Sequence, residues 1–167
     1  MMRRGQTLST DMLAAFAIFI FISDASILLW QSQVTRAQQV GSRNWIEGAA
    51  RSASSQLLSP GEPSNWEIAD FTKTPLHSFG LTSSNNVIEW GKMSRAIDLT
   101  SSPANYQMVK QNLGLECCEM WFGIVYSNGT VVGSFGRQVP ENISIVTIDR
   151  KAMLNSSPVT ARLRVWQ

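Results

Sequence analysis

The sequence has few side chains that bind metals or support nucleophilic catalysis. Of its 167 residues, one is a histidine, His77, and two are cysteines, the adjacent Cys117 and Cys118. A structural zinc site takes about four ligands, and a catalytic cysteine needs a nearby base. His77 lies in a short stretch bounded by Pro75 and Gly80, so we interpret it as a loop histidine. No metal centre or cysteine-based active site is expected.

The two cysteines also give no disulfide framework. Neighbouring cysteines close only a small ring whose geometry is unfavourable, so a bond between Cys117 and Cys118 is not expected. We expect one of the pair to be buried as a small apolar residue at the start of a strand. Two adjacent cysteines are compatible with an oxidising or a reducing compartment.

Charge is sparse as well. Only 16% of residues are charged, the net charge is +2, and 44% are hydrophobic, a composition that excludes a disordered chain. The longest basic clusters are the pairs Arg3-Arg4 and Arg150-Lys151, which are too small for a nucleic-acid-binding protein. The sequence has no G-x-S-x-G motif and no glycine-rich phosphate loop. We therefore expect neither an enzyme nor a bound cofactor, and no nucleic-acid partner.

Apolar residues are concentrated near the N-terminus. Met12–Ile22 contains no polar side chain, and the run continues to Trp30 with one interruption at Ser23-Asp24. As a helix, the nineteen residues 12–30 would be about 28 Å long, close to the thickness of a membrane core. The basic pair Arg3-Arg4 would keep the N-terminus on the cytoplasmic side. A secretory signal peptide cut after this run is disfavoured, because the mature chain would then begin with the apolar residues 27–30.

The helical pattern continues beyond Trp30 until Ser59-Pro60-Gly61. It predicts one helix over Thr7–Leu58, whose second half packs a narrow stripe on a globular domain. The stripe consists of Trp30, Val34, Ala37, Gly41, Trp45, Gly48, Ser52 and Leu57. On this pattern Trp45 should face the sheet.

The extreme N-terminus has a recognisable order of residues. A basic residue is followed by Gly5-Gln6, then by a short polar stretch containing Asp11, and then by the apolar helix. This order resembles an archaeal class III signal peptide of type IV pilin-like proteins. The resemblance implies that a prepilin peptidase cuts between Gly5 and Gln6, so that residues 1–5 are a leader. In the common pattern the serine is third and the acid fifth in the mature chain, whereas Ser9 and Asp11 are fourth and sixth.

The resemblance also implies where the chain is located before and after assembly, and which partners it has. The chain would be a single-pass membrane protein before assembly, with its N-terminus in the cytoplasm, and later a subunit of an extracellular, cell-surface filament with a role such as cell adhesion. Its implied partners are other pilin subunits in a homopolymer, the prepilin peptidase, membrane lipid and a pilus assembly platform. Asp11 and Asp24 are the candidate residues for subunit register and packing.

The middle of the chain extends the likeness. "PGEPSNW", "FGL", "VIEWGKM" and "NYQMVKQNLGL" occur in an order similar to that of many archaeal class III pilin-like proteins, and the similarity runs from Arg4 to about Val125. Independently of it, Ser101–Leu115 reads as a helix with Ser102 at its N-cap and Gly114 as its stop. A short strand over Val87–Trp90 precedes a helical turn or two.

The last third of the chain has the alternation of β-strands. Segments 120–126, 130–135, 143–154 and 159–166 predict four antiparallel strands, the first two joined by an Asn128-Gly129 turn in which both residues have positive φ. The expected fold is α+β and type IV pilin-like, with a long N-terminal helix over residues 6–59 packed on a C-terminal antiparallel sheet in a head over 60–167. Residues 12–30 form its transmembrane or assembly half.

The head contains three glycosylation sequons, which begin at Asn128, Asn142 and Asn155. All three fall in expected turns or strand edges, so they are candidate N-glycosylation sites, with an unmodified turn asparagine as the alternative. Tryptophans outside the helix are expected in the core or in loops, and a sugar-binding aromatic platform is the functional alternative; they are Trp66, Trp90, Trp121 and Trp166.

A second function stays open. An uncleaved helix would hold the β domain at the membrane as a surface recognition or binding protein that never polymerises. The start of the mature chain separates the two hypotheses, since Gln6 favours the pilin, Met1 or Met2 favours the tether, and a start near Ser26 indicates a secreted protein.

Overall fold

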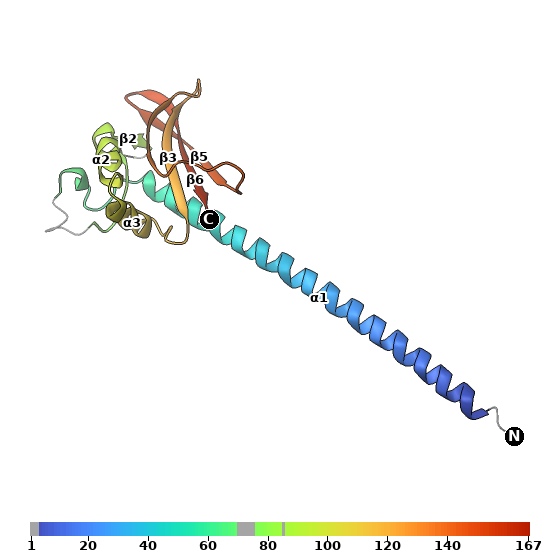
Figure 1. Cartoon of the computed structure of the whole chain (residues 1–167). Helices are drawn as coiled ribbons and strands as arrows, with labels where there is room; N and C mark the ends of the chain where they lie inside the picture. Colours follow the sequence, from blue (N-terminus) through green and yellow to red (C-terminus); the bar gives the residue numbers. More distant parts are fainter. Residues whose placement is uncertain (1–3, 70–75, 85) are drawn as a thin grey trace. The chain divides into compact units, whose positions relative to one another are not determined.

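The computed structural model describes residues 4–69, 76–84 and 86–167, with the side chains of 4–9 and 35–42 left aside. Its elements are α1 (Arg4–Leu57), the 3-10 helix η1 (Trp66–Ile68), β1 (Thr82–Ser84), β2 (Val87–Ile88), α2 (Trp90–Thr100), α3 (Pro103–Asn112), β3 (Glu119–Tyr126), β4 (Val131–Gly136), β5 (Val146–Leu154) and β6 (Ser157–Trp166) (Figure 1). The chain divides into two compact units, Met1–Arg43 and Asn44–Gln167. The second unit is called the head below. The predicted α+β class is confirmed.

α1 contributes its last part to the core of the head. Ala50, Ala53 and Leu57 are fully buried, while Trp45 is 56% exposed. The predicted stripe through Trp45, Gly48 and Ser52 is therefore wrong, because all three lie on the solvent side. The residues of α1 that belong to the hydrophobic core are instead Ala50, Ala53 and Leu57.

The chain after α1 is held by one buried tryptophan. Trp66 is fully buried, and its indole Nε1 donates a hydrogen bond to the Gly80 carbonyl at 2.7 Å. Its ring packs beside Phe79, with 4.7 Å between the ring centroids. A side chain at Gly80 would collide with the backbone of Ser59 and Gly61, so this close approach requires glycine.

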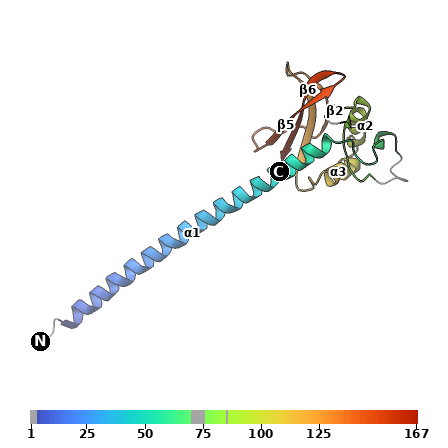
Figure 2. The ribbon, with the colours of Figure 1, turned by 180° about the vertical axis from the view of Figure 1, so that it is seen from behind.

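α2 and α3 lie on the core side of the sheet. Trp90 and Met93 of α2 approach the backbone of Gly133 in β4, where a Cβ atom would be 3.2–3.5 Å from their side chains. α3 begins after Ser102 and ends before Gly114, which has φ +69°, as the sequence indicates. Figure 2 shows both helices on one side of the strands.

The sheet has six strands rather than the predicted four, in the order β1-β2-β5-β6-β3-β4. β2 lies within the short strand predicted over Val87–Trp90 and ends earlier, because α2 begins at Trp90. β1 was not predicted, and its three residues are too few for a period-2 pattern to be recognised. β2 pairs in parallel with β5, and every other pair is antiparallel. The sheet is thus mostly antiparallel.

The turn between β3 and β4 differs from the prediction. In the β3–β4 turn only Gly129 has positive φ, at +86°, and the Asn128 side-chain oxygen accepts the Thr130 N–H at 2.9 Å. The register shift at Ile124 and Val125 accommodates the longer loop, so the predicted two-residue turn with two positive φ angles is wrong here. That geometry occurs instead between β5 and β6, where Asn155 and Ser156 have φ +48° and +65°.

The sheet has a core face and an outer face. Met120, Phe122 and Ile124 of β3 are buried with Leu163 and Val165 of β6 in one hydrophobic core. Because side chains alternate along a strand, Trp121 of β3 and Arg162 and Arg164 of β6 belong to the other face.

Candidate functional site

The described residues contain one helix long and apolar enough to span a membrane, the 25-residue segment Thr10–Val34 of α1, here called the apolar segment. None of it is buried inside the structure. Its large exposed hydrophobic residues are Met12, Leu13, Phe16, Ile18, Phe19, Ile20, Phe21, Ile22, Ile27, Leu28, Leu29, Trp30 and Val34. A continuous exposed apolar surface of this size requires an apolar environment, such as lipid or another apolar helix.

Two carboxylates interrupt this surface. The side chains of Asp11 and Asp24 are both exposed, and the residues are thirteen positions apart, about 20 Å along a helix. The structure therefore does not bring the two predicted packing residues together. The polar group of Ser26 has a partner within α1, because its hydroxyl donates to the Ile22 carbonyl at 2.7 Å.

The proposed cleavage residues Gly5 and Gln6 lie in the first turns of α1, which begins at Arg4. Their side chains are outside the described set. The three sequon asparagines, Asn128, Asn142 and Asn155, are all exposed and lie in separate loops of the head. The three do not form one site.

The cysteine prediction is wrong in one respect. Cys117 and Cys118 form a disulfide with each other, and the structure contains no free cysteine. The bond lies in the turn that precedes β3, where the Cys118 N–H donates to the Leu115 carbonyl at 3.1 Å. The two cysteines lie before the first residue of β3 and not in the strand itself. Cys118 is buried, as expected for one of the pair, and Cys117 is exposed.

His77 is exposed in the segment before β1. Its backbone N–H donates to the Glu62 carbonyl at 2.9 Å. Among the described residues, no group of three or more His, Cys, Asp or Glu side chains could hold a metal ion.

Glu119 is the centre of one cluster of polar interactions in the head. Its carboxylate accepts from the Lys110 ammonium at 3.0 Å and the Tyr106 hydroxyl at 2.8 Å, and it pairs with Arg137 at 3.2 Å. Burial raises the pKa of Glu119, but the hydrogen bonds from Lys110 and Tyr106 outweigh burial and bring the pKa below its ordinary value. Sequence reasoning missed this cluster because its members come from α3, β3 and the segment after β4. All its charges are paired, so its role is structural.

Lys92 is a second buried cation with a structural role. Only 2% of its surface is exposed, and its ammonium donates to the carbonyls of Pro60 and Thr82 at 2.7 and 3.0 Å. It satisfies backbone acceptors of the chain that follows α1, which explains why a charge is tolerated there.

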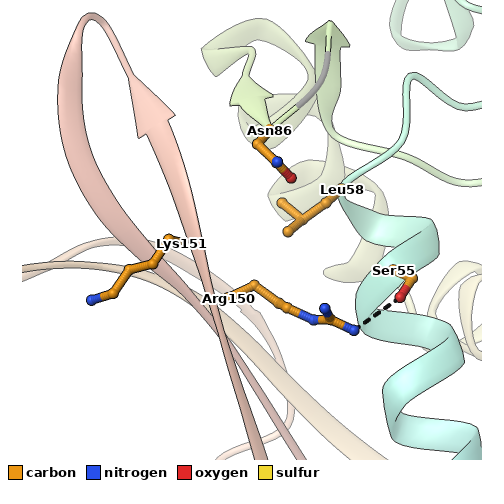
Figure 3. A pocket seen from close by; sticks show the side chains of 5 residues that line it. All are labelled: Ser55, Leu58, Asn86, Arg150 and Lys151. Carbon is orange, nitrogen blue, oxygen red and sulfur yellow. Dashed lines mark hydrogen bonds between the residues drawn. The ribbon is translucent and has the colours of Figure 1, made fainter.

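A hollow of about 310 Å³ lies in the head between the end of α1 and β5. It is lined by Ser55, Leu58, Asn86, Arg150 and Lys151 (Figure 3). The Arg150 guanidinium points into it and donates to the Ser55 hydroxyl at 3.1 Å, whereas the Lys151 side chain points away. One guanidinium, one hydroxyl and one amide can hold a single small anion, and none of these groups is a nucleophile paired with a base.

Comparisons with protein-family models, with curated proteins and with solved structures found no match.

Proposed function

We propose that this chain is a pilin-like structural subunit, inserted in a membrane through α1, cut by a prepilin peptidase between Gly5 and Gln6, and assembled into a surface filament. The observation that carries the proposal is the exposure of the apolar segment Thr10–Val34, none of which is buried, in the same helix whose last residues belong to the core of the head. In this proposal, lipid surrounds the apolar segment before assembly, and other copies of the helix surround it in the filament.

The physical basis of assembly is an exchange of apolar partners. Lipid covers the segment before assembly, and the same surface then packs against other copies of the helix. In such packing the specificity comes from close van der Waals contact, to which small residues contribute. The apolar segment has them at Ala14, Ala15, Ala17 and Ala25.

Support for the leader comes from the order of residues at the N-terminus, where a basic residue precedes Gly5-Gln6 and the apolar run begins at Met12. Removing residues 1–5 would discard Arg3 and Arg4 and leave a mature chain with no net charge. The basic pair would then act only in orienting the precursor, as expected for residues that hold an N-terminus in the cytoplasm.

The test is to co-express the full chain with an archaeal prepilin peptidase and to sequence the N-terminus of the product. We expect a mature chain that begins at Gln6, and an uncut product from the Gly5→Val variant. A product that keeps Met1 or Met2 would refute processing and favour the non-polymerising membrane tether. Electron microscopy of sheared surface fibres then tests polymerisation, and their absence in cells that make the processed chain would contradict the filament.

A further inference from the structure

The outer face of the sheet carries an aromatic ring among cations. The strand register places Trp121 of β3 opposite Arg164 of β6, and Arg164 opposite Thr147 of β5. Two residues further along β3, Gly123 pairs with Arg162 of β6, and Arg162 pairs with Asp149 of β5. These side chains lie on the side away from the hydrophobic core.

Trp121 is held in a defined place on this face. A Cβ atom at Gly123 would be 2.6 Å from Cζ2 and 3.0 Å from Cζ3 of the Trp121 ring, so the ring occupies the space that a side chain at position 123 would take. The guanidinium carbon of Arg164 lies 5.3 Å from the ring centroid, within the range of a cation–π interaction. Trp121 remains partly exposed.

Charge is distributed unevenly over the head. The head contains ten basic and ten acidic residues, yet β5 and β6 together contain four basic residues and one acidic residue, Asp149. Arg162 donates to both carboxylate oxygens of Asp149 at 2.8 Å. Within the described residues this leaves Lys151 and Arg164 without an ion pair of their own.

We propose that this outer face, formed by Trp121, Lys151, Arg162 and Arg164 with the hydroxyls of Thr147 and Thr160, binds an acidic polysaccharide. The apolar C–H groups of a sugar ring pack against the part of the indole that Gly123 and the Arg164 guanidinium leave exposed. A uronate carboxylate receives charge-assisted hydrogen bonds from Arg164. A second carboxylate of a linear polymer meets Lys151 of β5, the other cation of this face that has no ion pair with any residue the structure describes, because Arg162 is already bound by Asp149.

The chemistry favours a polyuronate over a nucleic acid. Nucleic-acid affinity depends mainly on neutralising many closely spaced phosphates, and the head as a whole has no net charge. Binding of single strands also uses several aromatic rings in sequence, whereas this face presents one. The hydroxyl-bearing threonines beside the cations suit sugar hydroxyls, which both donate and accept.

The test uses the full chain in a neutral detergent, with binding measured to immobilised oligogalacturonate and to a neutral galactan as the comparator. We expect binding to the acidic polymer only. The Arg164→Gln variant should bind about tenfold more weakly, the loss expected for one hydrogen bond to a charged group. Arg95→Gln is the matched control, because it removes one exposed charge from α2 on the core side of the sheet and should leave the affinity unchanged.

A second variant addresses the ring. Trp121→Leu keeps an apolar side chain over Gly123, and we expect it to weaken oligogalacturonate binding about tenfold with little change in melting temperature. Equal affinities of the Arg164→Gln variant and the unmodified chain would overturn the proposal, as would equal binding of the neutral galactan. Tighter binding to single-stranded DNA or polyphosphate than to oligogalacturonate would also overturn it, since it would show general attraction of polyanions.

Discussion

The Tyr106 hydroxyl in α3 donates a hydrogen bond to the Glu119 carboxylate at the start of β3, with 2.8 Å between Oη and Oε2. The same hydroxyl accepts the Met120 N–H at 3.1 Å. Tyr106 is 4% exposed, and its bond with the Met120 N–H is buried, whereas the bond to Glu119 is partly buried. One side-chain oxygen therefore connects α3 to the start of β3.

Replacing Tyr106 by phenylalanine should reduce the free energy of unfolding by about 1–3 kcal/mol, because a buried N–H and a carboxylate each lose a partner. Denaturant unfolding of the full chain in detergent, followed by near-ultraviolet circular dichroism, measures the change. Tyr126→Phe is the matched control, since Tyr126 is 37% exposed at the end of β3 and its loss of a hydroxyl should cost little. Similar losses in both variants would contradict the structural role of the Tyr106 hydroxyl.

The same residue predicts a dependence on alkaline pH. Burial, with the nearby Glu119 carboxylate, raises the pKa of Tyr106 to about 12 from 10.0. In the unfolded chain the phenol ionises near pH 10, so its contribution to stability is fully present below pH 10 and is lost as the pH rises toward 12. The difference in melting temperature between the unmodified chain and Tyr106→Phe should therefore shrink from pH 10 to pH 12. A constant difference across that range would refute the raised pKa.

The sequence was most informative where structure is local. The apolar run, the proline and glycine after α1, and the alternation in β3 and β6 each specify one element through neighbouring residues. Asn128-Gly129 correctly indicated a hairpin but not its turn type, because the loop length depends on where the strands on both sides pair. β2 lies within the short strand predicted over Val87–Trp90, but its place in the sheet depends on pairing with the distant β5. β1 pairs with β2, and its three residues carry no periodic signal.

Packing between distant segments determines which residues are buried and which polar groups meet. Trp45 and Ala53 both lie in the helical part of the head, and nothing in their spacing shows that the core selects the smaller side chain. Likewise the role of Glu119 depends on α3 and on Arg137 being folded around it. For the candidate sites, the sequence indicated the apolar segment and its two carboxylates, whereas the cationic outer face required the register of three strands.

The disulfide between Cys117 and Cys118 predicts the reactivity of the purified protein. A thiol-alkylating reagent should leave the denatured chain unlabelled before reduction and add two labels after it, since no other cysteine is present. Intact-mass spectrometry of protein purified without reductant makes the measurement. Two labels before reduction would show that both cysteines are free thiols.

Gly80 should be intolerant of any side chain. A Cβ atom there would lie against the Ser59 carbonyl oxygen and 2.6 Å from the Gly61 nitrogen, and backbone cannot move aside cheaply. We expect Gly80→Ala to lower the free energy of unfolding by about 3–4 kcal/mol. Gly91→Ala, with nothing within 4 Å, adds a methyl group to α2 and should raise it by about 0.5 kcal/mol. Chemical denaturation of both variants gives the comparison, and a Gly80→Ala protein as stable as the unmodified one would contradict the close approach.

Asp24 provides a test of the proposed assembly. An ionised carboxylate inside packed apolar helices is stable only with a partner, which a neighbouring copy would have to supply. If it has that role, Asp24→Ala should reduce filament yield about tenfold or more without changing the amount of chain in the membrane, because the partner is left uncompensated. Ser26→Ala is the matched control, since that hydroxyl is already bonded within α1 and its removal should leave the yield unchanged. Sheared filaments and membrane fractions are quantified by immunoblotting, and an Asp24→Ala chain that assembles at the normal yield would exclude Asp24 from subunit packing.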